Sequence, residues 1–87
     1  LFYSAAGLCD EAGEVAGKVK KWLRGDIGDA PMPDKDDLKK ELGDVLWYIA
    51  AICTDMGISM NDVAEHNIAK LSSRKERGVL HGSGDNR

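Results

Sequence analysis

The amino-acid sequence predicts an all-α domain, built as an antiparallel helical hairpin followed by a third helix. Apolar residues recur at spacings of three and four over three separate stretches, as they do on one face of an amphipathic helix. Alternation of period two is never sustained, and the β-branched residues are scattered, so no strand is predicted. We expect residues 1–77 to form the helical domain and residues 78–87 to form a glycine-rich tail.

The first helix is predicted from about Ser4 to Arg24, because Gly25 then supplies a stop signal. Its apolar positions are Leu8, Ala12, Val15, Val19 and Trp22. The connection 25–33, GDIGDAPMP, contains two glycines and two prolines and interrupts the pattern. A connection of nine residues favours an antiparallel arrangement of the helices that it joins.

The second helix is predicted to begin after Asp34, which can cap it, and to end near Met56, where Gly57 follows. Its apolar positions are Leu38, Leu42, Val45, Ile49, Ile52 and Met56. Ser59 and Asp62 resemble a capping box and open a third helix that fades near residue 77. The apolar positions of the third helix are Met60, Val63, Ala64, Ile68 and Leu71.

Composition predicts one soluble globular domain, since 43% of the 87 residues are hydrophobic, 31% are charged and the net charge is -3. Residues 70–87 carry five basic and two acidic side chains, or +3, which leaves -6 for the rest and disfavours a nucleic-acid-binding face. Neither a membrane span nor a signal peptide is indicated. Cys9 and Cys53 lie within apolar patterns, so we expect buried thiols and a cytoplasmic protein.

Three helices of this length cannot enclose all of their apolar residues, so we expect a homodimer or tetramer that completes a core resembling a four-helix bundle. The chain begins in the middle of an apolar pattern, and we therefore also expect a helix upstream of Leu1. Both tryptophans, Trp22 and Trp47, are expected to pack in the core.

One short motif occurs twice, as EAGEV at residues 11–15 and as ELGDV at residues 41–45. Residues three apart share a helix face, so each copy presents a pair of carboxylates beside the apolar positions. Glu14 and Asp44 are each ten residues, or about 15 Å, from the hairpin end, with Glu11 and Glu41 one turn to either side. The sequence therefore predicts that four carboxylates converge between the two helices.

Converging carboxylates repel one another, and a divalent cation removes this conflict. Oxygen ligands select hard cations such as Mg²⁺, and the chain has no Glu-x-x-His motif of di-iron bundles. The alternative interpretation is a solvated acidic face, which is common on amphipathic helices. Glycine weakens a helix, so we expect Gly13, Gly17 and Gly43 to permit a close approach between the helices.

The segments GLCDEAGEVAGKVKK, ELGDVLWYIA, NIAKL and GSGDNR resemble the MazG-like all-α nucleoside triphosphate pyrophosphohydrolases. The resemblance implies an enzyme that uses Mg²⁺, with Mn²⁺ as a possible substitute, to cleave nucleotides between the α and β phosphates. The implied metal ligands and catalytic residues are Glu11, Glu14, Glu41 and Asp44. Asp10 departs from the glutamate that is frequent in relatives, and either it or Glu11 would position or deprotonate the attacking water.

The resemblance also implies that Asn67 and Lys70 contact the nucleotide and its phosphates. Arg74, on the same stripe of the third helix, is a further candidate for substrate binding. The alternative interpretation of this stripe is a solvated polar edge. Lys21 is a further candidate for phosphate contact, although a solvated lysine is the simpler interpretation. The expected partner is a nucleoside triphosphate, in a house-cleaning or nucleotide-pool role. Two alternatives stay open: a phosphoribosyl-ATP pyrophosphohydrolase, and a non-catalytic helical interaction module.

Overall fold

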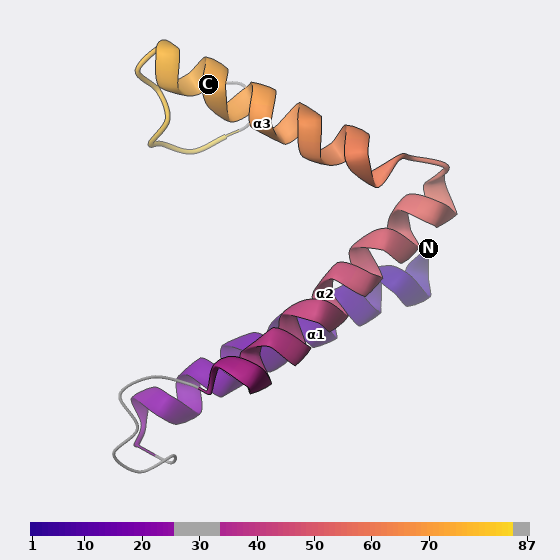
Figure 1. Ribbon diagram of the computed structural model, residues 1–87, viewed down its shortest axis with the longest axis vertical. Coiled ribbons are helices and arrows are strands. Elements are labelled where there is room, and N and C mark those ends of the chain that lie inside the picture. Colours follow the sequence, from indigo (N-terminus) through magenta and orange to yellow (C-terminus); the bar gives the residue numbers. More distant parts are fainter. Residues whose placement is uncertain (26–33, 85–87) are drawn as a thin grey trace. The chain divides into compact units, whose positions relative to one another are not determined.

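The fold is all-α, as predicted. The computed structural model describes residues 1–25 and 34–84, and these residues form three helices and no strand: α1 (Phe2–Leu23), α2 (Lys35–Met56) and α3 (Met60–Glu76) (Figure 1). Each helix begins and ends within two residues of its predicted bounds. The rest of the predicted 25–33 connection and the last three residues of the tail lie outside the described residues. The chain divides into two units, 1–57 and 58–87, which are described in turn.

Side-chain and glycine caps determine where α2 and α3 begin and where α2 ends. The Asp34 carboxylate accepts a hydrogen bond from the backbone N–H of Asp36 at 2.9 Å, and Gly57 ends α2 in the left-handed conformation at a φ of 65°. The Ser59 hydroxyl accepts from the N–H of Asp62 at 3.3 Å at the start of α3. The predicted caps are therefore confirmed.

In the first unit, α1 and α2 lie side by side and run antiparallel (Figure 1). Near one end the buried Ser4 hydroxyl donates to Asp55 at 2.6 Å, and this hydrogen bond is the main reason why the pKa of Asp55 is lowered. Near the other end the Lys18 ammonium lies 3.9 Å from the Asp37 carboxylate. These two contacts fix which residues of α1 face which residues of α2.

The predicted apolar positions of the hairpin are only partly buried. Leu8, Val15, Val19, Trp22, Leu38, Val45, Ile49 and Ile52 are half-buried. Ala12, Leu42 and Met56 are exposed in the single chain, and so is Trp47, which is 63% exposed. Cys53 is the one buried hydrophobic residue among those described, whereas Cys9 is exposed, contrary to expectation. Two helices bury one stripe of each other, so an apolar face of the hairpin stays open to water.

The close approach between α1 and α2 occurs at Gly7, where a Cβ atom would overlap the ring of Tyr48. The expectation that Gly13, Gly17 and Gly43 provide this approach is wrong, because a Cβ on any of them would meet no atom within 4 Å. The aromatic ring of Tyr48 therefore fills the space that the missing side chain of Gly7 leaves, one helical turn before Glu11.

We expect Gly7→Ala to destabilise the hairpin. The added methyl group must displace the Tyr48 ring, and overpacking of this kind costs about 1–3 kcal/mol, more than the helix propensity that alanine contributes. Gly13→Ala is the matched control, since its methyl group meets open space and should stabilise α1 by up to about 1 kcal/mol. Thermal unfolding followed by circular dichroism measures both, and a Gly7→Ala variant at least as stable as the wild type would contradict the prediction.

The second unit is described over residues 58–84 and consists of α3 and the segment that follows it. The larger apolar side chains of α3 are exposed, with Met60 at 39%, Val63 at 44%, Leu71 at 40% and Ile68 at 64%. After α3 the chain turns back alongside the helix (Figure 1). Among the described residues no single helix is long and apolar enough to cross a membrane, and only α2 and α3 counted together as a bent pair reach the required length and composition.

Candidate metal centre

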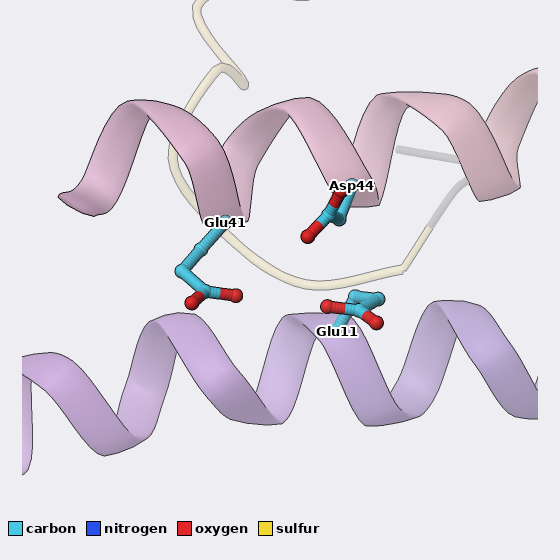
Figure 2. Close-up of side chains that lie close together, drawn as sticks. All are labelled: Glu11, Glu41 and Asp44. Carbon is cyan, nitrogen blue, oxygen red and sulfur yellow. The ribbon is translucent and has the colours of Figure 1, made fainter. Parts of the chain in front are cut away.

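Three carboxylates meet in the space between α1 and α2. Glu11, Glu41 and Asp44 can each offer one oxygen such that all three oxygens lie within 4.8 Å of one another. Figure 2 shows Glu11 reaching up from α1 and the other two reaching down from α2. Glu11 and Glu41 are half-buried and Asp44 is exposed, so the cluster is open on one side to solvent.

The cluster forms because the two helices present acids at matching heights. Glu41 and Asp44 are three residues apart and share one face of α2. Glu11 stands one turn beyond the Gly7–Tyr48 approach, and the contact between Lys18 and Asp37 lies on its other side. Packing on one side and an ion pair on the other therefore hold Glu11 opposite the acids of α2.

Partial removal from water, together with the negative charges nearby, raises the pKa of Glu11. Displacement of water by neighbouring protein atoms is the largest cause, followed by the charges of Asp44, Asp10, Glu41 and Glu14, in that order. A carboxyl group in such surroundings takes up a proton more readily than in free solution. A bound cation would have the opposite effect, because it favours the ionised form of every carboxylate that it contacts.

We expect the stabilising effect of Mg²⁺ to depend on pH. A raised pKa in the folded state means that Glu11 favours folding when it is protonated, and this contribution is lost as the pH rises from its ordinary pKa of 4.5 through the raised value. The metal-free protein should therefore lose this contribution at neutral pH, where added Mg²⁺ should raise the midpoint of thermal unfolding. At pH 4.5 the same addition should have a smaller effect, because Mg²⁺ must displace a proton.

Glu11→Gln serves as the control for this titration, since glutamine neither carries a negative charge nor titrates, and it keeps the size of the side chain. Its unfolding midpoint should respond weakly to Mg²⁺ at both pH values. An equal shift of the wild-type midpoint at pH 4.5 and pH 7.5 would contradict the prediction.

The remaining acids surround this cluster without joining it. Glu14 is exposed and lies outside the group of three, although its charge contributes to the raised pKa of Glu11. The predicted heights placed Glu14 level with Asp44, whereas the observed packing brings Glu11 close to both Glu41 and Asp44. Three of the four predicted carboxylates therefore converge, and the fourth, that of Glu14, lies one turn further along α1. Asp10 is exposed and directly adjoins Glu11.

The candidate substrate-binding residues differ in their accessibility. Lys21 is exposed near the end of α1, and Asn67 is exposed on α3. Lys70 is half-buried, and Arg74 is buried, with 4% of its surface exposed. Arg74 is therefore not a solvated residue, although the spacing places it on one stripe with Asn67 and Lys70. The two units are described separately, so the geometry brings Glu11, Glu41 and Asp44 together and leaves the positions of Asn67 and Lys70 as a prediction.

Tyr48 also lies near the acid cluster, close enough for the charges of Glu11 and Asp10 to affect its pKa. A hydrogen bond with Tyr3 is the largest cause of its raised pKa, and the charges of Glu11 and Asp10 add to the effect. The ring centroids of Tyr3 and Tyr48 are 6.4 Å apart, and Trp47 meets Tyr48 edge-on at 5.0 Å. A glycine within a helix, one turn before a candidate ligand, was the signal for this packing.

Comparison with known proteins identifies the family of this chain. The family model described as "MazG nucleotide pyrophosphohydrolase domain" matches residues 4–79, which include all three residues of the acid cluster. The chain belongs to the MazG family. It is 49% identical over 87 residues to "Gene 37 protein" of Mycobacterium phage L5, a match that covers 100% of this chain and 76% of the phage protein. No solved structure matches the chain.

Membership of the MazG family supports a nucleotide pyrophosphohydrolase activity, and MazG proteins generally depend on divalent metal. The acid cluster between α1 and α2 is a possible location for such a metal.

Proposed function

We propose that this MazG protein is an Mg²⁺-dependent nucleoside triphosphate pyrophosphohydrolase. It cleaves (deoxy)nucleoside triphosphates between the α and β phosphates and releases a nucleoside monophosphate and pyrophosphate. The observation that supports this proposal best is the group of three carboxylate oxygens within 4.8 Å of one another, supplied by two facing helices of a MazG domain. The proposed setting is the cytoplasm, where a house-cleaning enzyme meets the nucleotide pool.

The chemistry of the donor set fits Mg²⁺. All three groups are carboxylates, which hard cations prefer, and the open side of the cluster leaves room for water and substrate oxygens in the coordination shell. Glu11, Glu41 and Asp44 would hold the ion, and Glu14 would join them from the next turn of α1. Mn²⁺ has similar ligand preferences and would substitute. When bound, the cation neutralises phosphate charge and lowers the pKa of a coordinated water.

Individual side chains of the protein have different roles in the proposed hydrolysis. Asp10 or Glu11 orients the attacking water and accepts its proton, since Glu11 belongs to the acid cluster and Asp10 directly adjoins it. Asn67 contacts the nucleotide, and Lys70 contacts its phosphates, where a positive charge offsets the charge that accumulates during phosphoryl transfer. Lys21 is proposed to reach the outer phosphates from the exposed face of α1.

The active form is proposed to be a homodimer or a tetramer. Fourteen large hydrophobic side chains among the described residues are at least 36% exposed, and Cys53 alone is a buried hydrophobic residue. Leu38, Leu42 and Leu46 line a groove of about 530 Å³ on α2 together with Gly43, which would let another helix approach closely. A second copy of the chain covering this surface would complete a core resembling a four-helix bundle.

Product identification tests the proposed reaction. The protein is incubated with Mg²⁺ and a panel of nucleotides that includes the four deoxynucleoside triphosphates and phosphoribosyl-ATP, and the products are separated by anion exchange. We expect a nucleoside monophosphate and pyrophosphate from at least one triphosphate. Release of orthophosphate from the intact triphosphate would contradict cleavage between the α and β phosphates. Turnover of phosphoribosyl-ATP alone would reassign the substrate, and no turnover at all would favour a non-catalytic module.

A further inference from the structure

We infer that Arg74 is a positioning residue, which fastens residues 79–84 over the end of α3 and thereby shapes the surroundings of Lys70. Residues 79–84 are called the strap below. The inference rests on the proposed function, because it assigns Lys70 to the substrate phosphates. It differs from the prediction based on spacing, in which Arg74 itself contacts the substrate.

The burial of the second unit is concentrated at one place. Of the described residues from 58 to 84, only Arg74 is buried, and only Lys70 and Val79 are half-buried. All the other described residues of this unit are exposed, including every residue from 58 to 69. Burial in this unit therefore coincides with two basic residues of α3, Lys70 and Arg74, and with Val79, whereas the larger apolar side chains of the helix stay open.

Direct hydrogen bonds hold the strap in this position. The Arg74 guanidinium donates to the Gly84 carbonyl at 3.4 Å, and the Arg74 carbonyl accepts from the Val79 N–H at 2.9 Å. One residue thus binds the strap at both of its ends, through its side chain and through its backbone. The guanidinium lies in a residue that is only 4% exposed, so its contacts with the protein replace contacts with water.

Glycines allow the chain to follow this path. Gly78, Gly82 and Gly84 have φ values of 74°, 146° and 87°, a region that side chains with a Cβ atom rarely adopt. The path of the strap therefore depends on particular residue types: glycines at its turns and an arginine that binds it.

A fastened strap affects Lys70 in particular, because this residue lies one helical turn before Arg74 and shares its face of α3. Lys70 is half-buried as a residue, and a positive charge beside protein atoms that exclude water is less screened by salt than one in bulk water. Release of the strap should return Lys70 to bulk water and weaken its contact with an anion.

Two variants release the strap by different routes and provide the test. Arg74→Met removes the anchor, and Gly84→Ala strains the backbone at the point where the anchor binds without changing any charge. Lys75→Met, on an exposed neighbouring residue, is the matched control for loss of a basic side chain. Amide hydrogen exchange of residues 79–84 reports whether the strap is closed, and isothermal titration with inorganic pyrophosphate and Mg²⁺ reports anion binding.

We expect both Arg74→Met and Gly84→Ala to speed the exchange of the strap amides by about tenfold or more, as for loss of a hydrogen bond to a charged group. Both should weaken pyrophosphate binding by a similar factor, and the double variant should be no weaker than Arg74→Met alone. Pyrophosphate should slow the exchange of the wild-type strap, an effect that a purely structural strap would not show. Arg74→Lys should behave as Arg74→Met, because a point charge does not replace the planar guanidinium.

Three results would overturn the inference. Arg74→Met could lose pyrophosphate binding while the strap stays protected, which would place Arg74 on the phosphate itself. Gly84→Ala could free the strap and keep full affinity, which would separate the strap from the site. Arg74→Lys could restore affinity with the strap still open. Neither measurement requires turnover, so absence of hydrolysis by the wild type would refute the proposed reaction without deciding the role of Arg74.

Discussion

Glu41→Gln should lower the rate of nucleotide hydrolysis by at least about 100-fold, the loss that follows removal of one electrostatic group aimed at the reacting centre. Glu41 supplies one of the three converging carboxylates, and its amide replacement keeps the size of the side chain while removing the charge that a cation requires. The remaining pair, Glu11 and Asp44, would hold Mg²⁺ with one ligand fewer. Phosphate charge would then be neutralised less completely in the transition state.

The variant should retain its fold, because Glu41 makes no hydrogen bond or ion pair that stabilises the described hairpin and because removal of one charge relieves repulsion within the cluster. Far-ultraviolet circular dichroism checks the helical content, and release of pyrophosphate measures the rate. Glu76→Gln, at the end of α3, is the control for the same substitution outside the cluster, and its rate should equal that of the wild type. Full activity in Glu41→Gln would remove this residue from the set of ligands.

The second large effect concerns assembly: Leu46→Ser should weaken self-association and lower the unfolding midpoint. Leu46 is 54% exposed in the single chain and lines the groove on α2, and burial of a leucine against a second copy would contribute about 2 kcal/mol. A dimer has two such positions. Since folding is then coupled to association, a tenfold dilution should cost about 1.4 kcal/mol and lower the midpoint of the wild type measurably.

Sedimentation velocity at several concentrations, together with thermal unfolding, measures this effect. Lys40→Ser is the control, because it makes a similar change in helix propensity at an exposed polar position of the same helix. It should leave both the association and the midpoint unchanged. A folded monomer at micromolar concentration, with an unfolding midpoint independent of dilution, would argue against an oligomer.

Most of the fold was predictable from local signals in the sequence. The period of the apolar residues identified all three helices, and Asp34, Gly57 and Ser59 marked helix ends that the structure reproduces. These signals act between residues close in the sequence. Burial depends on which elements pack together. Leu42 and Trp47 fit a helical pattern and are exposed in the single chain, because two helices alone cover only part of each apolar face.

The acid cluster was predictable in its location and less so in its membership. Repetition of EAGEV as ELGDV identified the facing carboxylates, but the prediction of their relative heights assumed that both helices extend equally from the hairpin end. The observed packing depends on Gly7 and Tyr48, whose contact joins residues 41 positions apart. As a result Glu11, rather than Glu14, lies level with the acids of α2, and Glu14 lies one turn away from the cluster. The spacing of the acids within each helix does not show which residues of the other helix they face.

Arg74 illustrates a second limit of the sequence pattern. Its position on the stripe with Asn67 and Lys70 favoured a role in binding, while the structure buries it under the strap. The positive φ angles of Gly78 and Gly84 allow the chain to turn back on the helix. Glycines in a terminal segment are equally compatible with a disordered tail, so the sequence alone did not distinguish these two states.

A titration with Mn²⁺ followed by electron paramagnetic resonance tests the central claim most directly, because it observes the ion itself and requires no substrate. The wild type should bind Mn²⁺, and Mg²⁺ should displace it, while Glu11→Gln and Glu41→Gln should each weaken the binding by about tenfold or more, with Glu76→Gln unchanged. Binding of Mn²⁺ with the same affinity by the wild type and by Glu41→Gln would show that the carboxylates between α1 and α2 do not hold the cation.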